Sequence, residues 1–149
     1  MPSLTLSDGF AALNRGDLAT AGEACRQALE KDQAQASAHF LVGLVALEGK
    51  QRQVAHQAFK SVLKLDKDHA AAWAHLAKLN VGEGRIAAAE AALKEVRRIQ
   101  PSDPLVIELT GTVLNSLGEY EAAEIFFERA HQMVPKSTSA LMNLGNVRV

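Results

Sequence analysis

The chain has 149 residues, of which 48% are hydrophobic, 22% charged and 5% aromatic, and its formal net charge is −1 at pH 7. The length fits one ordinary domain, and 16 basic against 17 acidic residues argue against a strongly basic nucleic-acid binder and against an acidic solvating tail. The longest apolar run, Phe40 to Leu47, is far shorter than the roughly 20 residues needed to cross a bilayer, so no membrane insertion is expected.

The cysteine content and the first residues suggest where the protein works. A single cysteine, Cys25, can form neither an internal disulfide nor a multi-cysteine zinc site. No basic segment followed by an apolar stretch opens the sequence, so no secretory signal is expected. We therefore expect a reducing compartment, the cytoplasm.

The sequence repeats itself with a period of 34 residues. Alanines recur at this step at positions 21, 55, 89 and 123. Three further columns keep the same step: Gly9, Gly43, Ala77, Gly111 and Gly145; Cys25, Phe59, Leu93 and Phe127; Ala28, Val62, Val96 and Ala130. Four independent columns with one period predict a tandem repeat.

The predicted repeats follow one another without a linker. In chain order they are 2–35, 36–69, 70–103, 104–137 and a partial repeat at 138–149, which together form a single array over 1–149.

Each repeat is predicted to form two helices. In the third repeat, Ile86, Ala89, Leu93 and Val96 recur at the spacing of one helical face. The turns between paired helices are expected at glycines that fall in phase within one residue, namely Gly16, Gly49, Gly84 and Gly118.

Helix boundaries and the absence of strand patterns complete the assignment. In the fourth repeat, Asp103 before Pro104 predicts an N-cap followed by proline at the first helical position, and Pro101 ends the preceding helix. No alternating strand pattern occurs. The sequence predicts an all-α protein.

A 34-residue helix–turn–helix unit with this series of large and small apolar positions resembles the tetratricopeptide repeat. The third repeat carries the resemblance best, through Trp73, Leu76, Ala89, Leu93, Val96 and Pro101, and the fourth through Gly111, Gly118, Tyr120, Ala123, Phe127, Ala130 and Pro135. The resemblance implies a right-handed superhelical solenoid of antiparallel helix pairs.

The resemblance weakens toward the start of the chain. Lys67 and Gln33 stand where the family prefers proline, and Thr5 and Asp8 occupy columns that are usually apolar. These departures suit an N-terminal repeat whose outer face meets water.

The partial repeat at 138–149 supplies the first helix of a fifth unit. This helix is either a natural cap or the point at which a longer chain is cut. Its sequence runs on like an interior repeat, which favours a truncated chain.

In the family, the first helices line a concave groove that holds the ligand. Helical phase predicts which side chains face that groove. They are Phe10, Phe40, Leu41, Leu44, Leu47, His75, Lys78, Leu105, Glu108, Leu109, Thr112, Met142, Asn143 and Asn146. The apolar part of this set suits an amphipathic helix or an apolar peptide, unless the superhelix buries these side chains against neighbouring first helices.

Two ligand modes of the family fit poorly. Some members grip a carboxylate with groove Lys, Asn and Arg, whereas the matching positions here include Phe10, Leu41 and His75. Asn143 and Asn146 resemble the groove asparagines of O-linked N-acetylglucosamine transferases, but a solvated polar face explains them better.

No constellation for catalysis or cofactor binding is expected. The five histidines lack His-Glu-x-x-His spacing, so no metal site is predicted. The segment 82–87 matches Gly-x-Gly-x-x-Ala but follows a helix rather than a strand, so it is interpreted as a repeat turn. Cys25 shares a column with large apolar residues and is predicted to be buried rather than nucleophilic.

The sequence thus predicts a non-enzymatic scaffold or adaptor that binds a protein or peptide. The alternative is a substrate-recruiting or regulatory segment of a larger enzyme, because such arrays resemble those preceding bacterial sulfotransferase or glycosyltransferase domains. Self-association through an open C-terminal helix is a third hypothesis. An acidic stripe at Glu121, Glu124 and Glu128 is either a solvated face or a docking surface for a second partner.

Overall fold

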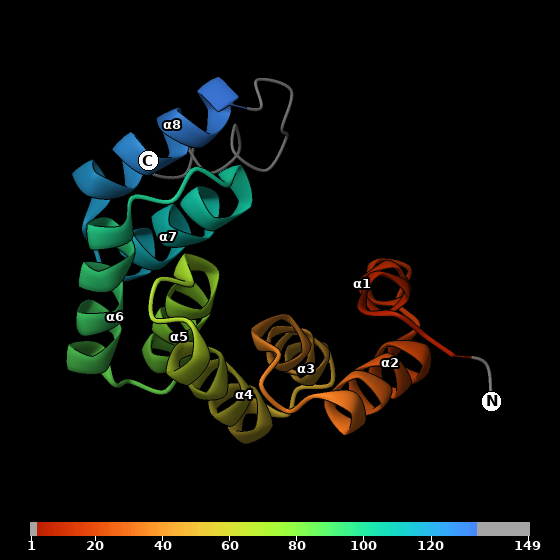
Figure 1. Ribbon diagram of the computed structural model, residues 1–149. Helices are drawn as coiled ribbons and strands as arrows, with labels where there is room; N and C mark the ends of the chain where they lie inside the picture. Colours follow the sequence, from red (N-terminus) through yellow and green to blue (C-terminus); the bar gives the residue numbers. More distant parts are fainter. Residues whose placement is uncertain (1–2, 134–149) are drawn as a thin grey trace. The chain divides into compact units, whose positions relative to one another are not determined.

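The computed structural model describes residues 3–133, and their regular structure is entirely helical. Figure 1 shows the helices in chain order from red to blue. In the described residues they are α1 (Leu6–Asn14), α2 (Leu18–Lys31), α3 (Ala36–Glu48), α4 (Arg52–Leu65), α5 (Ala70–Gly82), α6 (Ile86–Ile99), α7 (Pro104–Ser116) and α8 (Tyr120–Met133). These helices fit four pairs, whereas the fifth-repeat helix predicted at 138–149 lies outside the described residues.

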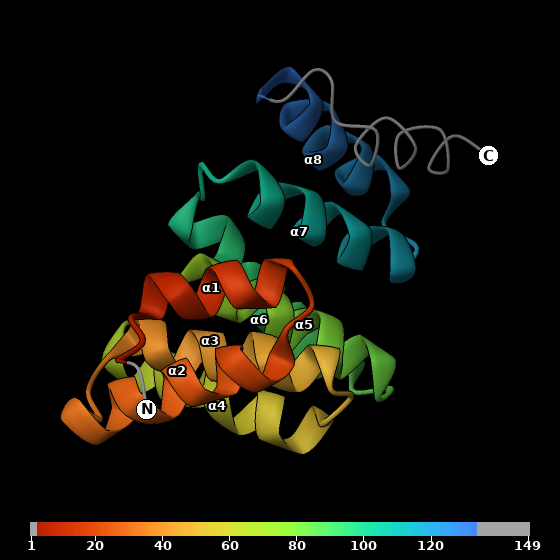
Figure 2. The same cartoon turned by 90° about the vertical axis from the view of Figure 1, so that its right-hand side faces the viewer.

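The chain divides into two compact units, Met1–Ala72 and Trp73–Val149. We call them the N-terminal unit, which holds α1 to α4, and the C-terminal unit, which holds most of α5 together with α6 to α8. In the N-terminal unit, α1 packs on α2, α3 on α4, and α3 also contacts α1 and α2. In the C-terminal unit, α8 returns antiparallel beside α7 (Figure 2). The prediction of one array spanning 1–149 stays a prediction.

The repeat columns form the cores of both units, as the sequence predicts. The alanines at positions 21, 55, 89 and 123 are completely buried. The third and fourth columns are buried as well, and so are the described members of the glycine-rich column. In the C-terminal unit, Ala77, Leu93, Leu114 and Phe127 belong to one cluster that joins α5, α6, α7 and α8. Small side chains at these positions let the helices approach closely, which explains the low aromatic content.

The turns inside the helix pairs use the left-handed backbone region. Gly16, Gly84 and Gly118 have φ angles of 80°, 76° and 80°, and in the second repeat Lys50 takes this conformation with φ 58°. Gly49 lies in the turn between α3 and α4, as predicted, but it is not the residue that takes the left-handed conformation. Gly49 is the C-cap of α3 with φ −82°, and Lys50 holds the left-handed position because it lies at the strict 34-residue step.

Side-chain caps fix the starts of several helices. Asp103 caps α7 by accepting a hydrogen bond from the Leu105 amide at 3.0 Å, and Pro104 follows it, as predicted. At α1, Thr5 and Asp8 form a reciprocal capping box, with Asp8 N to Thr5 Oγ1 at 3.1 Å and Thr5 N to Asp8 Oδ2 at 2.8 Å. These two polar residues satisfy backbone amides at the helix start, which explains their departure from the apolar pattern.

Candidate partner-binding surfaces

The first helices of the N-terminal unit carry a row of partly buried apolar side chains. Phe10 lies on α1, and Phe40, Leu44 and Leu47 lie on α3, each between the buried and the exposed class. Because α1 and α3 contact each other, these side chains belong to neighbouring helices. They are less exposed than a free groove lining would be.

Leu41 does not face a groove, so its assignment to the groove is wrong. Its side chain is completely buried. A Cβ atom added at Gly9 would lie 2.6 Å from Leu41 Cδ2, so the leucine fills the space above that glycine between α1 and α3. Leu41 is a core residue of the N-terminal unit.

Phe40 is partly engaged by its own unit. Its ring centroid lies 5.8 Å from that of Phe59 on α4 and 4.7 Å from that of His69, both in tilted arrangements. His69 in turn accepts a hydrogen bond at Nδ1 from the Ala72 amide at 3.1 Å, and burial lowers the pKa of its imidazole. Phe40, which is partly buried, therefore links α3 to the end of the second helix pair.

The C-terminal unit exposes more of its predicted groove residues. Leu105, in the first turn of α7, is 74% exposed, the highest value among the large exposed apolar side chains of the described residues. Glu108, Leu109 and Thr112 follow it on the same helical face and are partly buried. The Thr112 hydroxyl donates to the Glu108 carbonyl at 3.1 Å, so its own helix already engages it.

The two predicted groove residues on α5 differ in their exposure to solvent. Lys78 is exposed, whereas His75 is partly buried. Met142, Asn143 and Asn146, predicted on the fifth-repeat helix, lie outside the described residues.

The structure also has a surface that sequence reasoning missed. A shallow groove of about 400 Å³ runs between α2 and α4 in the N-terminal unit and has α3 as its floor. Its lining is formed by Leu29, His39, Val42, Gln53, Val54, Gln57, Ala58 and Ser61. Val54, one of these lining residues, is 45% exposed. A valine on the outward side of a second helix is the sequence signal that could have pointed to this surface. We call this surface the α2–α4 groove.

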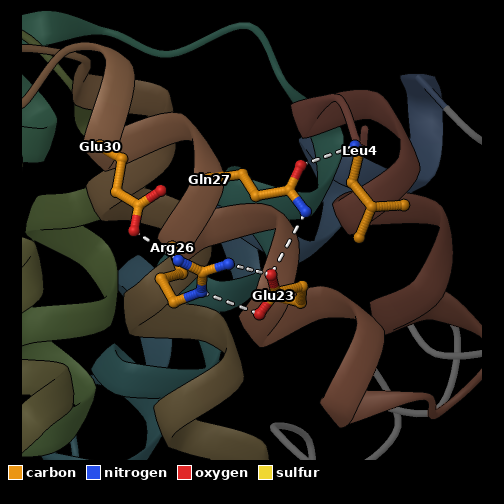
Figure 3. Close-up of polar contacts among 5 residues, drawn as sticks. All are labelled: Leu4, Glu23, Arg26, Gln27 and Glu30. Atoms are coloured by element: carbon orange, nitrogen blue, oxygen red, sulfur yellow. Dashed lines mark hydrogen bonds and ion pairs between the residues drawn. The ribbon is translucent and has the colours of Figure 1, made fainter. Parts of the chain in front are cut away.

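The outer side of α2 carries a closed polar network (Figure 3). Arg26 pairs with both Glu23 and Glu30, and its Nε lies 2.9 Å from Glu23 Oε2. Gln27 donates to Glu23 Oε1 at 3.2 Å and accepts from the Leu4 amide at 2.8 Å. Hydrogen bonds from Arg26 and Gln27 lower the pKa of Glu23 to about 2. Arg26 of α2 is therefore paired with acidic residues of its own helix.

Two observations on the described titratable groups bear on their reactivity. Among residues 3–133, no three His, Cys, Asp or Glu side chains gather closely enough to hold a metal ion. Cys25 is buried, as predicted, and burial raises the pKa of its thiol to about 11, which disfavours the nucleophilic thiolate. The segment 82–87 joins α5 to α6, which agrees with its interpretation as a repeat turn.

The comparisons with known proteins decide the family. Residues 46–111 match the family model described as Tetratricopeptide repeat. Residues 46–111 therefore belong to the tetratricopeptide repeat family. The predicted fold class, an all-α solenoid of antiparallel helix pairs, is confirmed by solved structures of similar fold. No curated protein matches the sequence.

Three solved structures illustrate the similarity. A structure from the functional characterization of PilF of Pseudomonas aeruginosa matches with a TM-score of 0.77 and 22% identity over 95% of this chain and 65% of that chain. The APC/C hetero-tetramer Cut9-Hcn1 matches with a TM-score of 0.76 and 21% identity over 95% of this chain and 29% of that chain. MamA matches with a TM-score of 0.65 and 21% identity over 88% of this chain and 77% of that chain.

These similarities bear on fold, and the lengths differ. This chain spans less than two thirds of the PilF chain and of the Cut9-Hcn1 chain that it matches. None of the three structures is named as a sulfotransferase or a glycosyltransferase, so the alternative of a segment recruiting substrate for such an enzyme gains no support. Within residues 3–133, every helix is too short or too polar to cross a membrane.

Proposed function

We propose that this protein is a non-catalytic scaffold that holds a peptide or an amphipathic helix against the first helices of its repeats. The observation that carries the proposal is the exposure of Leu105, at 74%, on the face of α7 that also presents Glu108 and Leu109. An apolar side chain so exposed in a first helix is available to a partner's apolar face. Cut9-Hcn1, one of the structures of similar fold, is itself a complex of two proteins by name.

The side chains on the first helices of the two units indicate which chemical groups the partner presents to them. Phe10, Leu44 and Leu47 in the N-terminal unit and Leu105 in the C-terminal unit favour apolar side chains. The exposed ammonium of Lys78 favours a carboxylate in the segment that binds the C-terminal unit. An amphipathic segment combines both features.

The proposal that the scaffold is non-catalytic rests on the chemistry of its reactive side chains. The thiol of Cys25 is buried with a raised pKa, and the His69 imidazole is engaged by the Ala72 amide and by the ring of Phe40. Neither group is positioned as an activated nucleophile or a free base.

The proposal is tested with purified protein and a displayed peptide library. Peptides selected on the wild-type chain are measured by fluorescence anisotropy against Leu105→Glu and against the matched control Tyr120→Glu. Tyr120 is 56% exposed in the same unit but lies on the second helix α8. Losing the burial of one leucine, worth about 2 kcal/mol, weakens binding by roughly 30-fold in Leu105→Glu.

Both variants are first compared with the wild type by circular dichroism, so that a loss of binding can be told from a loss of folding. Binding lost in Leu105→Glu and retained in Tyr120→Glu supports a partner on the first-helix face. Equal binding by both variants, or a library that yields no peptide, contradicts the proposal.

A further inference from the structure

One position on the second helices changes the sign of its charge in the last helix pair. The repeat column at this position reads Arg26, Lys60, Lys94 and Glu128, so a position that is basic in α2, α4 and α6 becomes acidic in α8. Arg26 is already paired within α2. The reversal at Glu128 leaves a basic surface on α4 and an acidic one on α8.

The basic surface borders the α2–α4 groove. Lys60 and Lys64 follow Gln57 and Ser61, which line the groove, on the same side of α4. Helix α4 contains no Asp or Glu, and within residues 3–133 neither lysine forms an ion pair. The groove itself offers Leu29, Val42, Val54 and Ala58 as apolar lining. This surface suits an apolar side chain flanked by carboxylates.

The acidic surface has that composition. Ile125 on α8 is 65% exposed, although it stands where the earlier repeats have Glu23, Gln57 and Ala91. The carboxylates of the acidic stripe surround it at helical spacing, Glu121 one turn before it, Glu124 beside it and Glu128 one turn after it. We call this surface the α8 ridge.

From this complementarity of charge and apolar surface, we propose that the chain binds a second copy of itself, with the α8 ridge of one copy seated in the α2–α4 groove of the other. Ile125 fills the apolar groove, and the carboxylates of the ridge face Lys60 and Lys64 on its rim. The inference lies beyond the proposed scaffold function, because it uses second helices and not the first-helix face.

The contact joins two different surfaces, so it is heterologous. After one contact has formed, one copy can still offer its groove and the other its ridge, and association continues from copy to copy into rings or longer assemblies. Because opposite charges steer and stabilise the contact, salt weakens it.

Two blocked variants of the full chain test the proposal. The groove variant carries Lys60→Glu and Lys64→Glu, and the ridge variant carries Ile125→Asp. All three positions are exposed, so the helical circular dichroism and the melting temperature serve as folding controls. Lys94→Glu is the matched control, since Lys94 occupies the position of Lys60 in the next repeat but lies on α6. Sedimentation velocity measures the molar mass of each protein as a function of concentration and salt.

We expect the molar mass of the wild type and of Lys94→Glu to increase with concentration. In each blocked variant, the dissociation constant for self-association should be higher than in the wild type by about tenfold or more. The decisive sample is an equimolar mixture of the two blocked variants. The groove variant still has its ridge and the ridge variant still has its groove, so the mixture forms a dimer of one copy each and nothing larger.

Three results would overturn the proposal. A wild-type chain that stays monomeric up to near-millimolar concentration excludes the contact. Association that survives in both blocked variants assigns it to another surface, such as the C-terminal residues 138–149. A mixture that remains monomeric shows that the two surfaces do not bind each other. None of these results depends on the peptide-binding measurements, so the two proposals fail independently.

Discussion

The ring of Phe59 on α4 lies directly over the backbone of Gly43 on α3, so closely that a Cβ atom at Gly43 would stand 2.5 Å from Phe59 Cε1. The fourth repeat repeats the arrangement, with a Cβ at Gly111 placed 2.7 Å from Phe127 Cε1. In the third repeat the same two columns hold Ala77 and Leu93, which share one core cluster. In the second to fourth repeats, glycine therefore accompanies phenylalanine and alanine accompanies the smaller leucine, because the two columns share one volume. In the first repeat, where Cys25 is small, Leu41 fills the space above Gly9.

Gly43→Ala is expected to destabilise the protein by up to about 2 kcal/mol. Overpacking against the ring costs ~1–3 kcal/mol, and the gain of ~1 kcal/mol from replacing a helical glycine offsets part of it. Urea unfolding followed by circular dichroism measures the change.

The matched control is Gly22→Ala in α2, where an added Cβ meets nothing within 4 Å. This variant is expected to gain about 0.5–1 kcal/mol from helix propensity alone. Adding Phe59→Leu to Gly43→Ala reproduces the pair found in the third repeat and should recover part of the loss. A stabilised Gly43→Ala single variant would contradict the assigned packing.

Lys50→Gly is expected to stabilise the N-terminal unit by about 0.5–1 kcal/mol. Lys50 has φ 58°, a left-handed conformation that costs a residue with a Cβ about 1–2 kcal/mol, and the extra freedom of glycine in the unfolded chain offsets part of the gain. Thermal unfolding of the variant and the wild type checks the sign.

Gly84→Ala is the reciprocal experiment for the turn position. Gly84 has φ 76° and an added Cβ meets nothing within 4 Å, so any loss comes from backbone strain and not from a clash. We expect a loss of about 1 kcal/mol. If Gly84→Ala were neutral, the explanation offered for Lys50 would fail with it.

Most of the fold was predictable because the repeat constrains it many times over. Ala21, Ala55, Ala89 and Ala123 were assigned to the core from their spacing, and all four are completely buried. The turn at Gly49 was predicted as well, but the left-handed conformation falls on Lys50, which lies at the strict 34-residue step from Gly16 and Gly84. Phase is the stronger signal, since the backbone conformation repeats with the period even where glycine does not.

The groove surface was less predictable, for a reason visible in α3. Phe40, Leu41, Leu44 and Leu47 are all apolar, so the hydrophobic pattern does not distinguish the side that faces the core from the side beside it. The structure resolves the ambiguity by burying Leu41 over Gly9 and by packing Phe40 against Phe59. Substituting Phe40 therefore changes stability as well as any partner contact.

Glu23→Gln is expected to reduce the loss of stability at acid pH. The pKa of Glu23 is lowered from 4.5 to about 2 by hydrogen bonds from Arg26 and Gln27, so the folded state releases this proton more readily than the unfolded state. Its contribution is fully present above pH 4.5 and is lost as the pH falls toward 2.

The measurement is the melting temperature between neutral pH and the acid limit. Glu23→Gln should begin lower at neutral pH and decline less steeply below pH 4.5 than the wild type does. Part of the decline remains, because hydrogen bonds at the helix starts also lower the pKa values of Asp8 and Asp17. Glu90→Gln on the exposed side of α6 is the control, and an identical acid profile in both variants would contradict the role of Glu23.

The thiol of Cys25 should resist modification until the N-terminal unit unfolds. It is buried between helices, and its pKa is raised from 9.0 to about 11, so little thiolate forms at neutral pH. Because the folded state holds the thiol proton more tightly, this group lowers stability as the pH rises from about 9 to 11.

The rate of disulfide exchange between Cys25 and an aromatic disulfide reagent should follow the unfolded fraction along a urea titration. Cys25→Ala removes this part of the alkaline dependence, so the difference between the stability profiles of the variant and the wild type isolates the thiol. Rapid labelling under native conditions would show instead that Cys25 is accessible and that the packing of the first repeat is wrong.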